Sequence, residues 1–181
     1  MLPLLKPGTR VIWTASGTHN PADVPYLPPA LEAASLAELL HPGEATSRGD
    51  GLQRYATSKL CVVRAVPELA RRLAAAGVRV NAFDPGLMPG TGLARDYSGG
   101  MRLAWQVLTP LLLLTPGAHR TATSARHLAD LAMDPRYVNL SGAYIVDHRP
   151  AGTSVASHDL AAAAQLYADT HRTIDAQHLP H

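Results

Sequence analysis

The 181-residue sequence predicts an α/β fold in which a parallel sheet has helices on both faces. Three short apolar runs, residues 10–16, 78–84 and 143–147, have the composition of buried strands. Stretches with apolar residues at helical spacing lie between and after them. Strands joined by helical crossovers pair in parallel, and the helices cover the sheet. Because there is no internal repeat and no linker, we predict a single domain over residues 1–181.

The first predicted strand, residues 10–16, is an apolar run that follows a Pro-Gly turn. No strand precedes it, so one of its edges should lack a partner, and an open edge favours association. A long insertion follows at residues 17–51. Its prolines exclude a long regular element, and only a short helix at 31–40 is expected within it.

A long helix is predicted at residues 52–76, where alanine, leucine and valine recur at helical spacing. Gly77 should end this helix, because glycine is the usual residue just beyond a helix terminus. Pro67 lies inside the helix. Proline has no backbone N–H to donate, so we expect it to kink the axis.

The second half of the chain contains the two remaining predicted strands, at 78–84 and 143–147. Residues 85–117 are rich in glycine and proline and form a predicted loop region with one helix inside it, at 101–114. A further helix is expected before the third strand, at 118–133. The last one follows that strand, at residues 159–175.

Composition excludes several classes of function. The formal net charge is +2 and the basic residues are scattered, so we expect no nucleic-acid partner. The nine histidines have no ligand-like spacing, and no metal site is expected. Cys61 is the only cysteine, which fits a reducing, cytoplasmic location. No apolar stretch approaches the ~20 residues that a membrane-spanning helix needs, so no membrane association is expected.

The pair Tyr55 and Lys59, four residues apart at the start of the long helix, is the main chemical signal. Residues at this spacing share one helical face. An ammonium close to a phenol favours the tyrosinate, which suits a phenol for acid–base catalysis near neutral pH. For the motif alone, a buried helix tyrosine beside a solvated lysine remains an equally open interpretation.

Two strand ends supply further polar groups. Ser16 ends the first predicted strand, and Asp84 ends the second, directly before Pro85 and Gly86. The carboxyl ends of parallel strands meet at one edge of a sheet, where α/β proteins bind their ligands. We therefore expect Ser16, the start of the Tyr55 helix and the loop after Asp84 to converge at this edge.

These residues resemble the short-chain dehydrogenase/reductase family. The stretch Thr14-Ala-Ser-Gly is similar to the family's serine-bearing strand end, and Tyr55 with Lys59 matches its Y-x-x-x-K motif. Pro85-Gly86 followed by Thr91 matches its P-G motif and the threonine after it. The 17–51 insertion is similar in length to the corresponding segment in the branch that contains protochlorophyllide reductases and retinol-dehydrogenase-like enzymes.

The resemblance implies a Rossmann-type fold and a role for each residue. Tyr55 would exchange a proton with a carbonyl or alcohol substrate, Ser16 would hold the substrate oxygen, and Lys59 would support the tyrosinate. The implied cofactor is NAD or NADP, and the branch favours NADP. Tyr55 and Lys59 would also contact this cofactor, together with the P-G loop: Pro85, Gly86 and Thr91. The region 85–117 would be the substrate loop.

The family's glycine-rich amino-terminal half is absent, because the sequence contains no G-x-x-x-G-x-G or G-x-G-x-x-G. The chain is therefore predicted to correspond to the carboxy-terminal part of a family member, beginning just before the fifth strand. Two alternatives to an active enzyme follow. One is a non-catalytic oligomeric remnant that binds a partner or small molecule, and the other is a half-enzyme completed by a separate chain. In either case a homodimer or higher oligomer is expected to cover the open strand edge.

Three other positions could have either a functional or a structural role. His19 follows Ser16 closely, but a loop histidine is expected there rather than a substrate contact. Cys61 is expected to be a small core residue rather than a reactive thiol. Trp105 and its helical neighbours Met101 and Leu108 are expected to pack in the core rather than line a substrate pocket.

Overall fold

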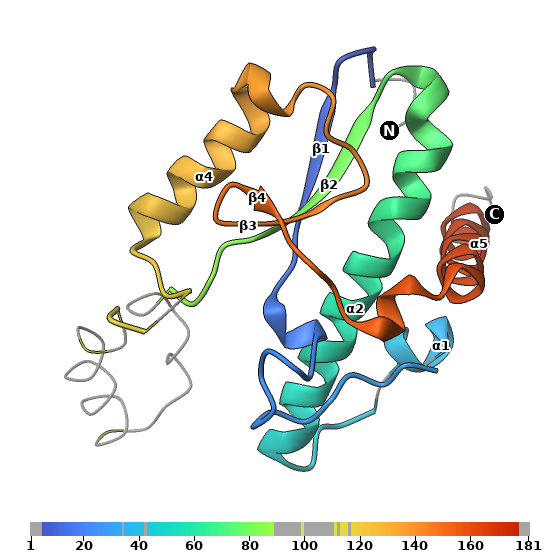
Figure 1. The fold of residues 1–181 in the computed structure, drawn as a ribbon. Helices are drawn as coiled ribbons and strands as arrows, with labels where there is room; N and C mark the ends of the chain where they lie inside the picture. Colours follow the sequence, from blue (N-terminus) through green and yellow to red (C-terminus); the bar gives the residue numbers. More distant parts are fainter. Residues whose placement is uncertain are drawn as a thin grey trace.

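The computed structural model describes residues 5–33, 35–41, 43–88, 99, 111, 113–115 and 117–177. Within these ranges it forms a four-stranded sheet with the order β1-β2-β3-β4 (Figure 1). The strands are β1 (Arg10–Thr14), β2 (Arg79–Asp84), β3 (Tyr144–Val146) and β4 (Arg149–Pro150). The α-helices are α1 (Leu36–Leu40), α2 (Arg48–Leu73), α4 (Thr121–Met133) and α5 (Leu160–Gln177). Short 3-10 helices are η2 (Gly17–His19), η3 (Ala74–Ala76), η5 (Pro135–Tyr137) and η6 (Val155–His158).

The predicted fold class is confirmed, because β1, β2 and β3 pair in parallel and helices flank the sheet. Strand β1 runs beside β2 from Arg10 opposite Arg79 to Thr14 opposite Phe83. Among the described residues β1 pairs only with β2, so no described strand lies beside its other edge, as expected from the sequence.

The short antiparallel strand β4 was not predicted. It returns along β3 after a two-residue turn formed by Asp147 and His148, which adopt positive φ angles of 46° and 68°. Such turns are usually signalled by Asn-Gly or Asp-Gly, and this sequence has neither at the turn. The preceding parallel strands were visible in the sequence because they are continuous apolar runs, whereas β4 is exposed.

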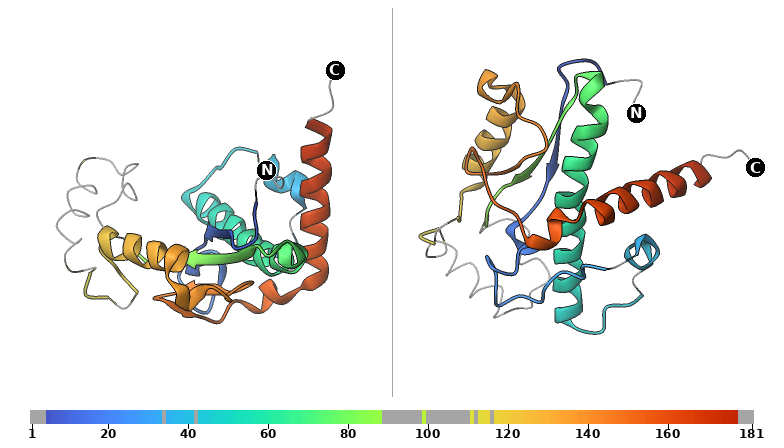
Figure 2. Two further views of the ribbon diagram at one scale, coloured as in Figure 1. Left: turned by 90° about the horizontal axis from the view of Figure 1, so that it is seen from above. Right: turned by 45° about the vertical axis from the view of Figure 1, so that its right-hand side comes forward.

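The two faces of the sheet are covered by different helices. Val80 and Ala82 of β2 point into a core formed with Val63 and Val66 of α2. Phe83 points to the opposite face, where it belongs to a second core cluster with Leu131 of α4. Helix α5 packs against α2 on the side away from α4 (Figures 1 and 2).

Helix α2 begins and ends with residues suited to its termini. Ser47 and Asp50 form a reciprocal capping box, which moves the start of the helix upstream of the predicted residue 52. The helix continues through Pro67 without interruption. After the η3 turn, Gly77 adopts a left-handed conformation with φ 69°, and this confirms the predicted end at this glycine.

The 17–51 insertion packs along the first half of α2. Its helix α1 has only five residues, fewer than predicted, because Ser35 and Glu38 form a capping box that sets the start inside the expected range. The insertion is held by the hydroxyl of Thr57, which accepts a 2.9 Å hydrogen bond from the Leu31 amide. No helix among the described residues is both long and apolar enough to span a bilayer.

Candidate active site at the carboxyl ends of the strands

Ser16 lies directly beyond the carboxyl end of β1. The amide of Ala15 still donates to the Phe83 carbonyl of the neighbouring strand, at 2.7 Å, so the backbone remains in register up to this point. Ser16 then caps η2, and its hydroxyl oxygen accepts a 3.4 Å hydrogen bond from the Thr18 amide. This places the serine at the strand end, where the sequence predicted it.

Tyr55 and Lys59 reach the same end of the sheet from α2. The ammonium of Lys59 donates a 3.1 Å hydrogen bond to the carbonyl oxygen of Thr14, two residues before Ser16. The same ammonium lies 5.4 Å from the centre of the Tyr55 ring. The Tyr55 side chain is 47% exposed, so it is accessible to a small molecule. The structure therefore brings the Tyr–Lys pair to the carboxyl end of β1.

The turn after β2 is organised by Asp84. One carboxylate oxygen of Asp84 accepts a 2.8 Å hydrogen bond from the Gly86 amide, and the other accepts a 2.6 Å bond from the Tyr144 hydroxyl. A methyl group added to Gly17 would lie 3.5 Å from the latter oxygen, so the turn after β1 is in contact range of Asp84. The two strand ends are therefore adjacent.

Gly86 is required by its surroundings as well as by its backbone. Its φ angle is +73°, and a Cβ atom at this position would lie 2.5 Å from the Gly117 carbonyl oxygen and 2.6 Å from the His119 ring. Leu87 then pairs with residues on either side of Ala118 through two backbone hydrogen bonds. Thr91 lies outside the described residues, as do Met101, Trp105 and Leu108, whose predicted roles therefore stay predictions.

His19 was expected to be an ordinary loop histidine, and this was wrong. It is only 1% exposed, lies in η2, and contacts both Ser16 and the buried segment before η6. No sequence pattern distinguished it, because its burial depends on Tyr144 and Ser154, which are more than a hundred residues away in the chain.

A cluster of three histidines was also missed. His119, His127 and His148 come from the segment before α4, from α4 itself and from the β3–β4 turn. The His127 and His148 ring centres are 3.7 Å apart, and His119 Nε2 lies 2.6 Å from an Asp147 oxygen in a direction unsuited to a hydrogen bond. Burial, together with the nearby His148 and His119, lowers the pKa of His127. Across the described ranges, no group of three or more His, Cys, Asp or Glu side chains is arranged so that it could hold a metal ion.

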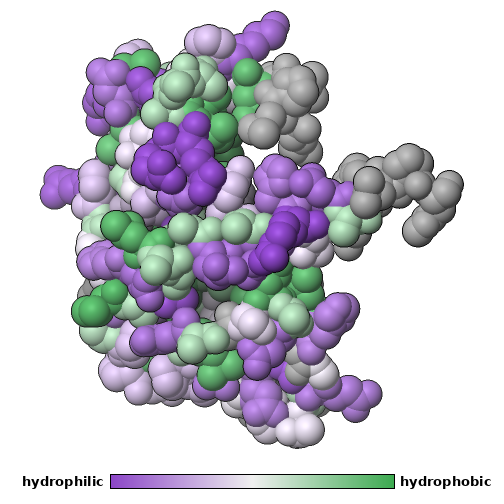
Figure 3. Space-filling view, turned by 90° about the vertical axis from the view of Figure 1, so that its right-hand side faces the viewer, coloured by the Kyte–Doolittle hydropathy of each residue, from purple (hydrophilic) through white to green (hydrophobic). Residues whose placement is uncertain are grey.

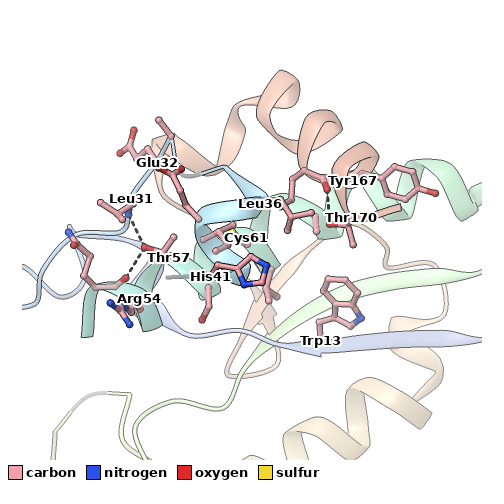
Figure 4. A pocket seen from close by; sticks show the side chains of 18 of the residues that line it. Trp13, Leu31, Glu32, Leu36, His41, Arg54, Thr57, Cys61, Tyr167 and Thr170 are labelled. Carbon is pink, nitrogen blue, oxygen red and sulfur yellow. Dashed lines mark hydrogen bonds between the residues drawn. The ribbon is translucent and has the colours of Figure 1, made fainter. Parts of the chain in front are cut away.

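An apolar groove of about 1230 Å³ lies on the α2–α5 side of the molecule, beside β1. Its walls include Trp13 of β1, Leu36 of α1, Val62 of α2 and Ile174 of α5. Cys61 was expected to be a small core residue, but it is only partly buried and lines this groove (Figure 4). Burial raises the pKa of its thiol, which favours the unreactive protonated form. On the surface, apolar and polar residues are interspersed along α5 (Figure 3).

Comparisons with known proteins support this description at a coarse level. No protein-family model matches the chain. The chain is 33% identical, over 132 residues, to the short-chain dehydrogenase iccH of Talaromyces variabilis. That similarity covers 63% of this chain but only 35% of the relative, so the chain spans about a third of the relative's length.

A solved structure of an uncharacterized protein from Mycobacterium paratuberculosis is also similar. The TM-score is 0.57 at 21% identity, and the match covers 95% of this chain and 52% of that one. At this identity the match shows the fold alone. The sequence comparison thus shows similarity to a protein named as a short-chain dehydrogenase, and the structural comparison supports the α/β fold.

Proposed function

We propose that the chain is the carboxy-terminal part of an NAD(P)-dependent oxidoreductase of the short-chain type, which interconverts a carbonyl and an alcohol. The observation that supports this most directly is the hydrogen bond from Lys59 to the Thr14 carbonyl. It ties the helical face that carries Tyr55 to the strand end that carries Ser16. In this proposal, Ser16, Tyr55 and Lys59 are the catalytic residues.

The roles of these side chains follow from their chemistry. The Ser16 hydroxyl would donate a hydrogen bond to the substrate oxygen. The Tyr55 phenol would give its proton to that oxygen as the carbonyl becomes an alcohol, and would take it back in the reverse direction. The positive charge of Lys59 would stabilise the tyrosinate left behind. A bound NAD(P) would supply or accept the hydride.

The described residues fit the nicotinamide end of such a cofactor. An ammonium has three donors, and Thr14 uses only one from Lys59, so hydrogen bonds to a ribose are compatible with the observed contact. The absence of a side chain at Gly86 lets the turn after β2 pack closely against the Gly117 carbonyl and the His119 ring. Tyr55, Lys59, Pro85, Gly86 and Thr91 are the proposed cofactor contacts.

The pyrophosphate of the cofactor has no comparable binding site, because the sequence has no glycine-rich turn of the kind that holds a dinucleotide. Orientation of bound reactants is worth ~7–11 kcal/mol of a reaction barrier. We therefore expect weak cofactor binding and low activity from these 181 residues alone. The length of the 17–51 insertion is consistent with the protochlorophyllide reductase and retinol-dehydrogenase-like branch, for which NADP is the expected nucleotide.

A second candidate function is a non-catalytic oligomer that binds a partner or small molecule. The apolar groove beside the open edge of β1 favours it, because an unpaired strand edge and exposed apolar surface both promote association. A homodimer or higher oligomer is part of this proposal, and it is compatible with the oxidoreductase as well.

Cofactor titration separates the two functions. We expect the fluorescence of NADPH, present at millimolar concentration, to change when the protein is added, and Lys59→Met to weaken that change. Tyr55→Phe should retain binding but lose turnover of a test ketone, because only the proton donor is removed. No fluorescence change with either NADPH or NADH would favour the non-catalytic oligomer.

A further inference from the structure

Three buried or partly buried side chains form a continuous path between the carboxyl ends of β1, β2 and β3. They are His19, just after β1, Tyr144 of β3 and Asp84 of β2. Each contacts the next, and the two ends of the path contact Ser16 and Gly86. The path therefore connects the proposed substrate-binding serine with the proposed cofactor-binding turn.

The His19 ring is held from both sides. Its Nδ1 atom lies 2.7 Å from the Ser16 carbonyl oxygen, and its Nε2 atom lies 3.4 Å from the Ser154 amide nitrogen. A carbonyl oxygen can only accept and an amide N–H can only donate. Both bonds are satisfied by the neutral ring with its hydrogen on Nδ1. The ring thus fixes the backbone of Ser16 against the segment before η6.

Tyr144 connects this ring to β2. The His19 and Tyr144 rings meet edge to face, with centroids 4.9 Å apart and planes at 69°, a favourable geometry for aromatic pairs. The Tyr144 hydroxyl donates a 2.6 Å bond to Asp84. Burial and the negative charge of Asp84 raise the pKa of Tyr144, so this hydroxyl keeps its proton. It is therefore a permanent donor to Asp84 and does not compete with Tyr55 as an acid.

Asp84 completes the path by holding the turn that follows it. One of its oxygens accepts the hydrogen bond from the Tyr144 hydroxyl and faces Gly17. The other oxygen accepts the hydrogen bond from the Gly86 amide. Loss of the Tyr144 hydroxyl would leave the first oxygen without this donor. The carboxylate would then be free to rotate and release Gly86.

We propose that His19, Tyr144 and Asp84 form a positioning network that sets the Ser16 hydroxyl relative to the Pro85–Gly86 turn. His19 is the positioning residue for Ser16, and it acts through the Ser16 carbonyl rather than on substrate. The network itself is independent of catalysis, but its consequence for turnover rests on the proposed oxidoreductase function.

Nuclear magnetic resonance of the full chain without cofactor tests the network. The amides of Thr18 and Gly86 are the reporters, because Thr18 bonds the Ser16 hydroxyl and Gly86 bonds Asp84. Tyr144→Phe keeps the ring against His19 and removes only the hydroxyl bonded to Asp84, so it should change the chemical shift and speed the hydrogen exchange of the Gly86 amide, by about three- to tenfold for one lost hydrogen bond. The control is Tyr137→Phe, which removes a hydroxyl bonded to the His148 carbonyl and should leave both reporters unchanged.

A matched pair of substitutions at His19 separates positioning from packing. His19→Asn keeps a donor near the place of Nδ1, whereas His19→Leu fills similar space without one. The His19 Nδ1–H resonance should be observable in the wild type. The amide chemical shift of Thr18 should stay close to the wild-type value in His19→Asn and move in His19→Leu. An unchanged Gly86 amide in Tyr144→Phe, or an unchanged Thr18 amide in His19→Leu, would overturn the proposal.

Kinetics give the second readout. His19→Leu should lower kcat by about tenfold with KM for NADPH changed less than about twofold, and His19→Asn should restore part of the loss. Equal loss in both variants, or loss confined to KM, would contradict positioning. If the wild type shows neither turnover nor binding of NADPH or NADH, the proposed oxidoreductase function fails, while the resonance measurements still decide the network.

Discussion

The ammonium of Lys59 and the carbonyl oxygen of Thr14 are joined by a 3.1 Å hydrogen bond. This contact links the middle of α2 to the last residue of the edge strand β1, 45 residues earlier. It holds Lys59 and the neighbouring Tyr55 at the strand end that continues into Ser16. One side chain therefore contributes to the fold and to the proposed site.

Replacement of Lys59 by Met should lower the free energy of unfolding by about 1 kcal/mol, because one partly exposed hydrogen bond is lost. Urea unfolding measures this change. The control is Lys6→Met, the only other lysine, whose side chain is exposed. Equal stability of Lys59→Met and the wild type would mean that the Thr14 contact contributes nothing to the fold.

Gly86 should tolerate alanine much less well than Gly117. Both have positive φ angles, +73° and +76°, but only at Gly86 would a Cβ atom meet backbone, at 2.5 Å. We expect Gly86→Ala to cost about 3 kcal/mol, from backbone strain and overpacking together, and Gly117→Ala about 1 kcal/mol from strain alone. Thermal and urea unfolding of the two variants check this difference. Similar losses in both would show that the close approach to the Gly117 carbonyl is relieved easily.

Acid should destabilise the protein through His127. Its pKa is lowered by burial first and then by His148 and His119, while Asp147 and Asp130 oppose this. The unfolded chain has an ordinary histidine pKa of about 6.5, so it binds more protons than the folded chain below that pH. The free energy of unfolding should therefore be fully retained above about pH 6.5 and decline as the pH falls.

His127→Gln should make this decline shallower, measured as urea unfolding at a series of pH values. His171→Gln is the control, because His171 is 54% exposed and lies on α5 away from the cluster. Its curve should follow the wild type. Parallel curves for His127→Gln and the wild type would exclude His127 as the titrating group.

Trp13 is expected to lie in an interface between copies of the chain. It is 38% exposed on the edge strand and also lines the apolar groove. In sedimentation at tens of micromolar, the wild type should be a dimer or larger, and Trp13→Lys should be shifted toward monomer. Val155→Lys, at a position 89% exposed outside the groove, should sediment like the wild type. A monodisperse wild-type monomer would count against this association.

The main elements of the fold could be predicted because each rests on a local pattern. The apolar runs became the parallel strands β1, β2 and β3, and the helical spacing with Gly77 located α2 and its end. Strand β4 and the short α1 could not be placed correctly. The former depends on a turn without the usual residues, and the latter on a capping box inside a proline-rich insertion.

For the site, the sequence by itself determined which residues carry polar chemistry and that Ser16 and Asp84 follow strands, because strand ends in a parallel sheet share one edge. Only the tertiary structure decided that His19 is buried against Tyr144 and that Lys59 reaches Thr14. It alone also decided that Asp84 holds the Gly86 turn and that three histidines meet near Asp147. Apart from the local bond between Asp84 and Gly86, these contacts join residues from distant parts of the chain. A local pattern can set the direction of a side chain, but the partner that it meets depends on how distant elements pack.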